Sequence, residues 1–296
     1  MEKFRILTAA FALSLAALAV LLLTQLIISS LPAMETFGFR FVIESAWDPV
    51  KEVFGALPFI YGTLVTSFIA LLFAVPLSIG AAVFLTQYIS PKVSYVLSFL
   101  IEIIAAIPSV VIGLWGIFVV IPFVREEAGP FLVEYLGFIP TFQGPVYGPS
   151  ILTGALILTI MIVPIITSIT KDAINTVPIL QREGMIALGA TRWEVITKVM
   201  LPYARPGIMG GVMLGLGRAI GETMAITMVI GNAPEIPASL LAPGDTLASV
   251  IANQFSEATS ALHESALIEL GLILFIITIV INICARLILR REVARE

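Results

Sequence analysis

The chain contains little of what disulfide frameworks, metal clusters and water-facing surfaces are built from. Its 296 residues include one cysteine, Cys284, and one histidine, His263. One residue of each type excludes an internal disulfide framework and a cluster of histidine and cysteine metal ligands. Charged residues make up 12% of the chain, about half the share in an average soluble domain. Together with an apolar share of 59% and a mean hydropathy of +1.06, this scarcity of charge excludes a soluble globular enzyme and a disordered chain.

Apolar residues are abundant instead. They make up 59% of the chain, and the mean hydropathy is +1.06. A helix needs about 20 apolar residues to cross the hydrocarbon core of a bilayer, and its backbone then satisfies its own hydrogen bonds. The sequence therefore predicts an all-α integral membrane protein with six spanning helices, at Ile6–Ser30, Phe59–Thr86, Tyr95–Ile121, Ile151–Thr170, Gly207–Ile230 and Ala266–Leu289.

Lysine and arginine are distributed unevenly between the loops. With the N-terminus inside, the outer loops hold only Arg40, Lys51 and Arg125. Positive residues concentrate on the cytoplasmic side of membrane proteins, so this asymmetry predicts that both termini are cytoplasmic. The inner segments hold Lys3, Arg5, Lys92, Lys171, Arg182, Arg192, Lys198, Arg205, Arg286, Arg290, Arg291 and Arg295.

One inner loop, residues 171–206, is much longer than the others. Its first half predicts a short helix over 179–188, with Pro178 in its first turn, Asn175 or Thr176 as its N-cap, and a stop at Gly189. A loop of this length in a compact protein is usually functional. The residues themselves leave two interpretations open, an amphipathic helix pair on the membrane surface or a docking site for a cytoplasmic partner.

The second half of this loop predicts another helix. Thr191 and Glu194 have the spacing of a capping box, and the sequence predicts that Leu201-Pro202 ends the helix. Trp193, Ile196 and Met200 are expected to share one face.

Two charges lie in the fifth predicted span. Arg218 is near its middle, where a charge costs roughly 2.5–3.5 kcal/mol on insertion scales. Glu222 follows four residues later and is expected on the same helix face. The pair could be an internal salt bridge or a translocation-path site that binds an anion through the forked donors of arginine. A stripe of small residues, Gly207, Gly211 and Gly215, predicts close packing against another helix.

A few other polar positions carry expectations. Glu102 lies shortly before Pro108, which is expected to kink the third span, so Glu102 is a further translocation-path candidate. His263 is expected to be a solvated loop residue rather than a metal ligand. Residues 246–255 are expected to form a short surface helix, and Asn282 to hydrogen-bond across helices.

The long inner loop resembles a known motif. The segment Glu183–Gly189, followed after nine residues by Val199–Pro202, is similar to the EAA loop of ABC-importer permeases. That motif has a glutamate, two alanines, a glycine six positions after the glutamate, and Ile-x-Leu-Pro. Here Gly184 and Met185 stand at the alanine positions and Val199 stands at the isoleucine position.

The resemblance implies a MetI-like (type I ABC importer) permease fold without catalytic residues, cofactor or metal. The chain has no P-loop motif, so a cytoplasmic ABC ATPase dimer is the expected partner. The implied domain organisation is a first helix with its external loop (1–58), a permease core (59–289) and a cytoplasmic tail (290–296). The implied coupling residues are Arg182, Glu183, Gly184, Ala187, Gly189, Ala190, Arg192, Leu201 and Pro202.

Further segments resemble the phosphate-importer permeases of this class. They are 101–109, 201–207, 217–225 and 246–253. This resemblance implies transport of inorganic phosphate across a bacterial or archaeal cytoplasmic membrane, with an extracytoplasmic phosphate-binding protein, a second homologous permease and membrane lipid as partners, and no nucleic acid. Arg218 alone does not distinguish phosphate from sulfate or molybdate. An ion-coupled secondary carrier is the alternative from another class, and copurification with an ATPase would separate the two.

Overall fold

The computed structural model describes the backbone of residues 2–293 and the side chains of residues 4–287. In this part of the chain all regular structure is helical apart from two isolated β-bridges, which confirms the all-α prediction. The long helices are α1 (Glu2–Phe37), α3 (Leu57–Gln87), α4 (Pro91–Ala106), α8 (Ile151–Asn175), α11 (Leu201–Ile220) and α14 (Ala261–Val293). The short α-helices are α2 (Arg40–Ile43), α5 (Ser109–Trp115), α6 (Ile121–Phe123), α7 (Gly129–Leu136), α9 (Ile179–Ala187), α10 (Arg192–Val195), α12 (Met224–Thr227) and α13 (Leu247–Gln254).

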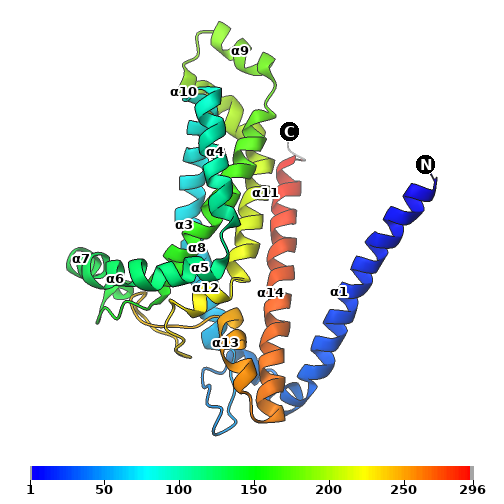
Figure 1. Ribbon diagram of the computed structural model, residues 1–296, viewed down its shortest axis with the longest axis vertical. Helices are drawn as coiled ribbons and strands as arrows, with labels where there is room; N and C mark the ends of the chain where they lie inside the picture. The colour runs from blue at the N-terminus through cyan, green and yellow to red at the C-terminus, as the bar shows by residue number, and fades with distance from the viewer. Residues whose placement is uncertain (1, 294–296) are drawn as a thin grey trace.

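A bundle of roughly aligned helices forms the body of the molecule (Figure 1). The most buried helix is α8, which packs against α3, α4 and α11. Five described helices are long and apolar enough to cross a membrane: 4–37, 57–87, 109–136, 151–175 and 261–287. The glycines and the two arginines of α11 lower its hydropathy, so α11 is not among these five although it runs within the bundle.

The third predicted span is broken rather than kinked. Helix α4 ends at Ala106 and a new helix begins at Ser109, because Ile107 and Pro108 both adopt extended backbone angles. The segment from α5 to α7, joined by π-helical turns at 116–120 and 124–128, runs across the bundle axis as an arm (Figure 1). The predicted continuous helix over Tyr95–Ile121 is therefore wrong.

The fifth predicted span has different ends from those expected. Helix α11 starts at Leu201, because the chain passes from α10 through a π-helical turn at 196–200 directly into it. The prediction that Leu201-Pro202 ends a helix is wrong, since Pro202 lies in the first turn of α11, where its missing N–H has no consequence. The helix stops at Ile220 instead of Ile230, and α12 follows after a short break.

The glycine stripe of α11 packs on α8 as predicted. A Cβ at Gly207 would overlap the Ala173 side chain, and a Cβ at Gly215 would lie 2.8 Å from the Ile166 side chain. Gly211 faces Ile169 in the same way. The absent side chains let the two backbones approach closely.

Helix α1 contacts the rest of the molecule mainly through α14. The Ser265 hydroxyl accepts a hydrogen bond from the N–H of Ala33 and donates one to the carbonyl of Ser29. Beside this contact, His263 is 5% exposed and stacks on Phe54 with ring centroids 5.1 Å apart. The expectation that His263 is solvated is wrong, because it belongs to an aromatic core with Trp47 and Phe59.

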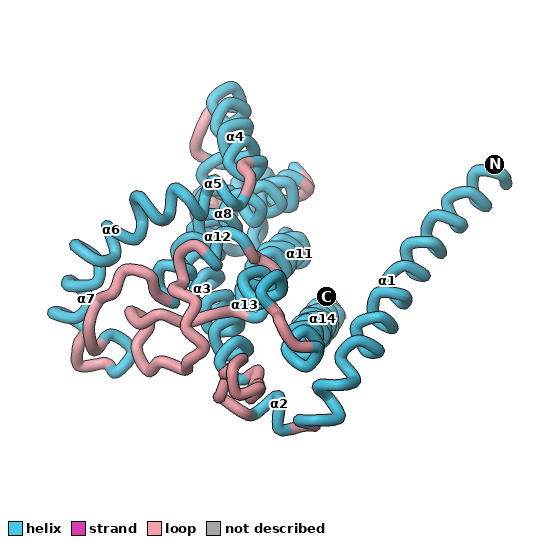
Figure 2. The backbone as a smooth tube through the Cα atoms, turned by 60° about the horizontal axis from the view of Figure 1, so that its bottom comes forward, coloured by secondary structure: helices cyan, strands magenta, loops and turns pink. Residues whose placement is uncertain are grey.

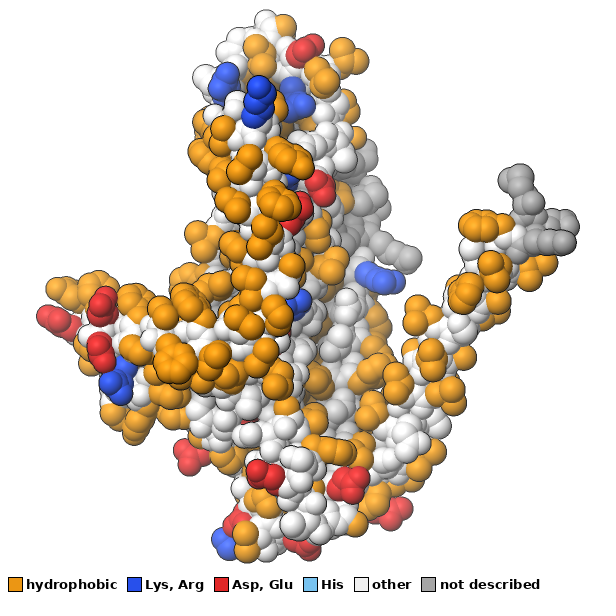
Figure 3. All heavy atoms as spheres, in the orientation of Figure 1, with side chains coloured by type: hydrophobic (Ala, Val, Ile, Leu, Met, Phe, Trp, Pro, Cys, Tyr) orange, Lys and Arg blue, Asp and Glu red, His pale blue; other side chains and the backbone are white. Residues whose placement is uncertain are grey.

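Two ends of the bundle can be distinguished. Both termini lie toward the end that carries α9, while α13 lies toward the other end (Figure 1). Figure 2 shows the loops around α2, α7 and α13 gathered at this second end. In Figure 3, Lys and Arg side chains gather near α9 and most visible acidic ones lie on the arm tip and at the α13 end. Of the predicted inner cations, Arg295 and the side chains of Lys3, Arg290 and Arg291 lie outside the described residues.

Candidate coupling loop and translocation site

The loop between α8 and α11 projects beyond the end of the bundle (Figure 1). Helix α9 begins after Pro178, which is its N-cap, so neither Asn175 nor Thr176 caps it. At its end Gly189 has a φ of +85°, a conformation that favours glycine. The N–H of Ala190 donates to the Met185 carbonyl and the N–H of Gly189 to the Ile186 carbonyl. This is the Schellman arrangement, and it confirms the predicted stop at Gly189.

Helix α10 has the predicted capping box. The Thr191 hydroxyl accepts from the N–H of Glu194, and the Glu194 carboxylate accepts from the N–H of Thr191 at 2.9 Å. Lys198 forms an ion pair with the same carboxylate at 3.0 Å. The hydrogen bond from the Thr191 backbone, followed by that from Lys198, lowers the pKa of Glu194 to about 2. The capped α10 leads through the π-helical turn at 196–200 directly into α11.

The predicted coupling residues lie together at this end of the molecule. A cleft of about 280 Å³ between α9 and α10 is lined by Arg182, Glu183 and Arg192, with Gln87 from the end of α3. Gly184 and Ala187 are exposed on α9, Gly189 and Ala190 form the turn, and Leu201 and Pro202 begin α11.

Large apolar side chains on this loop are exposed. Leu188 is 86% exposed and Leu180 is 83% exposed. Ile196 and Met200 are buried against the bundle, but Trp193, which was predicted to share their face, is 62% exposed. The loop thus has an apolar inner side and a second apolar set that the described chain does not cover.

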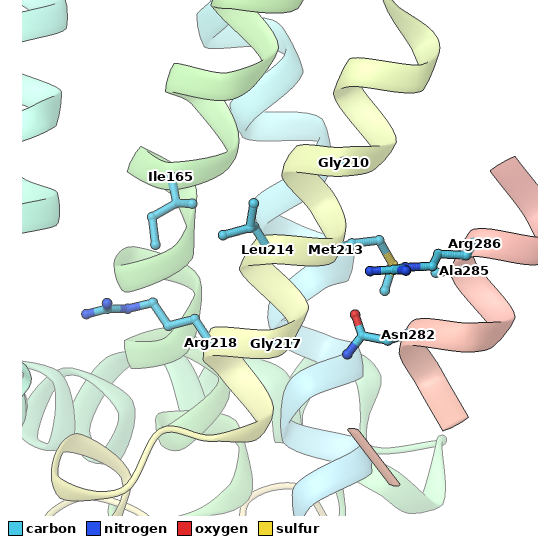
Figure 4. A pocket seen from close by; sticks show the side chains of 9 residues that line it. All are labelled: Ile165, Gly210, Met213, Leu214, Gly217, Arg218, Asn282, Ala285 and Arg286. Atoms are coloured by element: carbon cyan, nitrogen blue, oxygen red, sulfur yellow. The ribbon is translucent and has the colours of Figure 1, made fainter. Parts of the chain in front are cut away.

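Arg218 follows Gly215 by three residues on α11 and therefore lies beside the glycine stripe. It lines a cavity of about 570 Å³ between α8, α11 and α14. Its Nε atom is buried and has no hydrogen-bond partner among the described residues. The other residues that line the cavity are Ile165, Gly210, Met213, Leu214, Gly217, Asn282, Ala285 and Arg286, shown in Figure 4.

Glu222 does not share this site in the way that its spacing suggested. Because α11 ends at Ile220, Glu222 is no longer one helical turn from Arg218, and no ion pair joins the two in the described part of the chain. The buried Glu222 carboxylate instead accepts a hydrogen bond from the N–H of Ala225 in the first turn of α12. The expected pair on one helix face is therefore wrong, and Arg218 is left without its predicted counter-charge.

Glu102 lies on α4, apart from both Arg218 and Glu222. It is exposed on α4 and lines a narrow cleft between α4 and α8 that also holds Ser98 and Lys171. Lys171 donates a hydrogen bond of 2.8 Å to the Ser98 hydroxyl. The structure thus places the three predicted translocation residues in three separate surroundings.

Sequence reasoning missed a buried polar network at the α13 end. Helix α13 was expected at the surface, but its first turns are buried, with Thr246 as the N-cap. The Ser249 hydroxyl contacts the Thr227 hydroxyl at 2.9 Å and the Asn232 side chain at 3.2 Å. Asp245 precedes the helix and accepts from the N–H of Thr246. No periodicity in the sequence identifies this network, because its members come from separate segments.

Comparison with known proteins identifies the family. The family model described as "Binding-protein-dependent transport system inner membrane component" matches residues 74–294. The chain belongs to this family. The assignment confirms the resemblance to importer permeases and the predicted location in the inner membrane, and it makes the chain the membrane component of a transport system.

Individual members of the family are closely similar over most of the chain. The phosphate transport system permease protein PstC of Mesorhizobium japonicum is 50% identical over 275 residues, which are 92% of this chain and 84% of that protein. The PstC of Pasteurella multocida is 45% identical over 297 residues, 99% of this chain and 92% of that protein. A solved bacterial alginate ABC transporter has a chain of the same fold, with a TM-score of 0.64 at 20% identity, covering 98% of this chain and 96% of that one.

Proposed function

We propose that the chain is the permease subunit of an ATP-driven importer of inorganic phosphate and forms half of the translocation pore. The identity of 45–50% with phosphate permeases along almost the whole chain carries the proposal. The Arg218 cavity supports it, because a guanidinium presents forked donors that suit a tetrahedral oxyanion. The second half of the pore would come from a second homologous permease, and an extracytoplasmic phosphate-binding protein would deliver the anion at the α13 end.

The α9 end then faces the cytoplasm, and the loop of residues 171–206 docks on an ABC ATPase dimer. Two observations support docking over the alternative of a helix pair lying on the membrane surface. The loop projects beyond the bundle in the direction of its axis, and its outward residues combine exposed leucines with a charged cleft. The hydrogen-bonded turn at Gly189 and the capped α10, which is continuous with α11, can transmit a movement of the ATPase to the helix that carries Arg218.

Arg218 is proposed to contact the anion on its way through the pore. Glu222 is proposed to act by fixing the break between α11 and α12, and Glu102 by lining, with Lys171, the separate cleft between α4 and α8. Since no carboxylate is paired with Arg218 in the described chain, the guanidinium is available to a passing anion.

The test is uptake of labelled phosphate by the complex reconstituted in proteoliposomes with ATP. Saturable, ATP-dependent uptake that excess sulfate and molybdate do not reduce is expected. Uptake of one of those oxyanions instead would replace the substrate but keep the permease assignment. Transport by this chain alone, without an ATPase, would contradict the importer assignment.

A second measurement addresses Arg218. The Arg218→Ala variant should assemble with its partners but lose at least roughly tenfold in uptake at low phosphate, because one hydrogen bond to a charged group is worth about 1.5–3 kcal/mol. Unchanged uptake by an assembled complex would show that Arg218 has a structural role and does not contact the anion.

A further inference from the structure

The Arg218 cavity has a second cationic wall, which the sequence did not suggest. Arg286 and Asn282 on α14 both line it, four residues apart and therefore on one helix face. In Figure 4 both side chains extend from α14 toward α11, while Arg218 extends from α11 toward the side of α8 that carries Ile165. The cavity thus has one guanidinium at each side of the exposed face of α11.

The two arginines lie at different depths. Figure 4 places Arg286 level with Met213, five residues before Arg218 on α11. Because α11 begins at the α9 end, Arg286 lies nearer to that end than Arg218 does.

The charges on this cavity have no acidic counterpart in the described chain. No aspartate or glutamate is among its lining residues. Neither arginine belongs to an ion pair between described residues. Asn282 did not form the expected bond to another helix, because it donates to the Thr278 carbonyl of its own helix at 2.8 Å. A cavity whose only charges are positive attracts anions.

Two glycines of α11 leave free space on the wall of the cavity that α11 forms. Gly210 and Gly217 on α11 line it, and a Cβ built on either would meet nothing within 4 Å. These glycines therefore differ from the stripe that packs on α8, since nothing in the packing of the described chain requires them. They leave room beside the two arginines.

We propose that Arg286 and Asn282 form a second oxyanion contact, which receives the anion from Arg218 and passes it toward the α9 end. Two contacts at different depths divide the passage into shorter steps, so that no single contact holds the anion too tightly for release. This inference rests on the proposed function, because it concerns the same substrate and the same pore.

The first test is uptake by Arg286 variants in the reconstituted complex. Arg286→Gln should reduce ATP-dependent phosphate uptake roughly tenfold at low phosphate, while Arg286→Lys, which keeps the charge but not the fork, should recover only part of it. The matched control is Lys92→Gln, which removes an exposed cation at the start of α4, away from the cavity. If Arg286 only orients the chain in the membrane, the lysine variant will be fully active and the proposal is wrong.

A second pair of variants tests whether the free space beside Gly217 is needed for transport. Gly217→Leu places a side chain in the cavity without a clash and should abolish uptake while assembly is retained. Gly80→Leu is the control, because Gly80 is also exposed and free of neighbours but lies on α3, outside the cavity. Equal uptake by the two variants would overturn the proposal.

Thiol labelling separates failure of the site from failure of the function. The single cysteine is replaced by Cys284→Ser, and Asn282→Cys is added. A negatively charged thiosulfonate should label this cysteine faster than a positively charged one, and inorganic phosphate should slow the labelling. If sulfate or molybdate slows the labelling and phosphate does not, the oxyanion contact is supported but the transported anion is not phosphate. Labelling that prefers the cationic reagent and that no oxyanion slows would overturn the contact even if the complex transports phosphate.

Discussion

At the scale of single residues, Asp245 is the acidic group most affected by its surroundings outside the spanning helices. It is 2% exposed, and burial raises the pKa of its carboxyl to about 7. The hydrogen bond from the N–H of Thr246 acts in the opposite direction but does not compensate. The backbone carbonyl of Asp245 also lies so close to Gly62 on α3 that any side chain there would overlap it. The connection before α13 is therefore tightly held against α3.

This raised pKa predicts how stability depends on pH. Below the unfolded value of 3.8 both states hold the proton. Between 3.8 and about 7 the unfolded chain loses it while the folded protein keeps it, so folding stability falls as pH rises through this window. Asp245→Asn keeps an acceptor for Thr246 but cannot ionise, and should raise stability on the order of 1–3 kcal/mol at pH 8 and less at pH 5.

Thermal unfolding of the detergent-solubilised chain at both pH values measures the effect. Glu235→Gln is the control, because Glu235 is an exposed acid in the same connection. A gain for Asp245→Asn that is equal at pH 5 and pH 8 would contradict the assignment of the ionisation to Asp245.

Residues with a local signature could be predicted from the sequence, and residues whose role depends on distant neighbours could not. Gly189 and Thr191 act through their own backbone and the next few residues, so their patterns were sufficient. His263 is buried because residues 41–59 fold over it, and Arg286 lines the same cavity as Arg218 because α14 returns beside α11. No spacing along the chain encodes either contact.

At the scale of elements, α11 has glycines on two faces. One face has no room for a side chain, and the other does. Gly207 faces α8, where a side chain overlaps Ala173, whereas Gly210 faces open space. Gly207→Leu should therefore destabilise the bundle by about 1–3 kcal/mol through overpacking. Gly210→Leu has the same change in helix propensity and should leave the thermal unfolding temperature of the solubilised protein unchanged or slightly raised. Equal unfolding temperatures for the two variants would show that α8 and α11 do not pack as described.

The turn after α9 offers a similar comparison. Gly189→Ala forces a residue with a Cβ into positive φ, at a cost of roughly 1 kcal/mol, and should redirect α9. Gly184→Ala adds the same methyl group within α9, where it meets nothing and favours the helix. Copurification of the ATPase should fall several-fold for the first variant only. Full retention by Gly189→Ala would mean that the shape of this turn does not matter for docking.

Element boundaries were the least predictable part of the fold. Hydrophobicity continues through Pro108 and through Gly221, so both spans looked continuous. The breaks depend on tertiary packing, because α5 and α12 lie against each other and a Cβ on Gly113 would be 2.8 Å from the Cα of Ala225. A proline or glycine marks where a helix can break, but the packing of the two short helices decides that it does.

At the scale of the whole molecule, the distribution of charged side chains and the position of the termini favour the same orientation in the membrane. On the face shown in Figure 3, Lys and Arg side chains gather near the α9 end and most of the visible acidic ones lie on the arm tip and at the α13 end, and both termini lie toward the α9 end. In a membrane such a distribution favours the basic end in the cytoplasm. The binding-protein side would then be the acidic end, where the loops around α2, α7 and α13 gather.

This orientation predicts which positions a membrane-impermeant thiol reagent reaches in intact cells. In the Cys284→Ser background, a cysteine at Glu52 or at Gln143, both exposed in loops at the α13 end, should be labelled from outside. A cysteine at Gln181, exposed on α9, should be labelled only after the cells are made permeable. The three variants differ in side but not in exposure, so each is a control for the others. Labelling of Gln181→Cys in intact cells would reverse the orientation, place the exposed leucines of α9 outside, and remove the ATPase from the end where we propose that it docks.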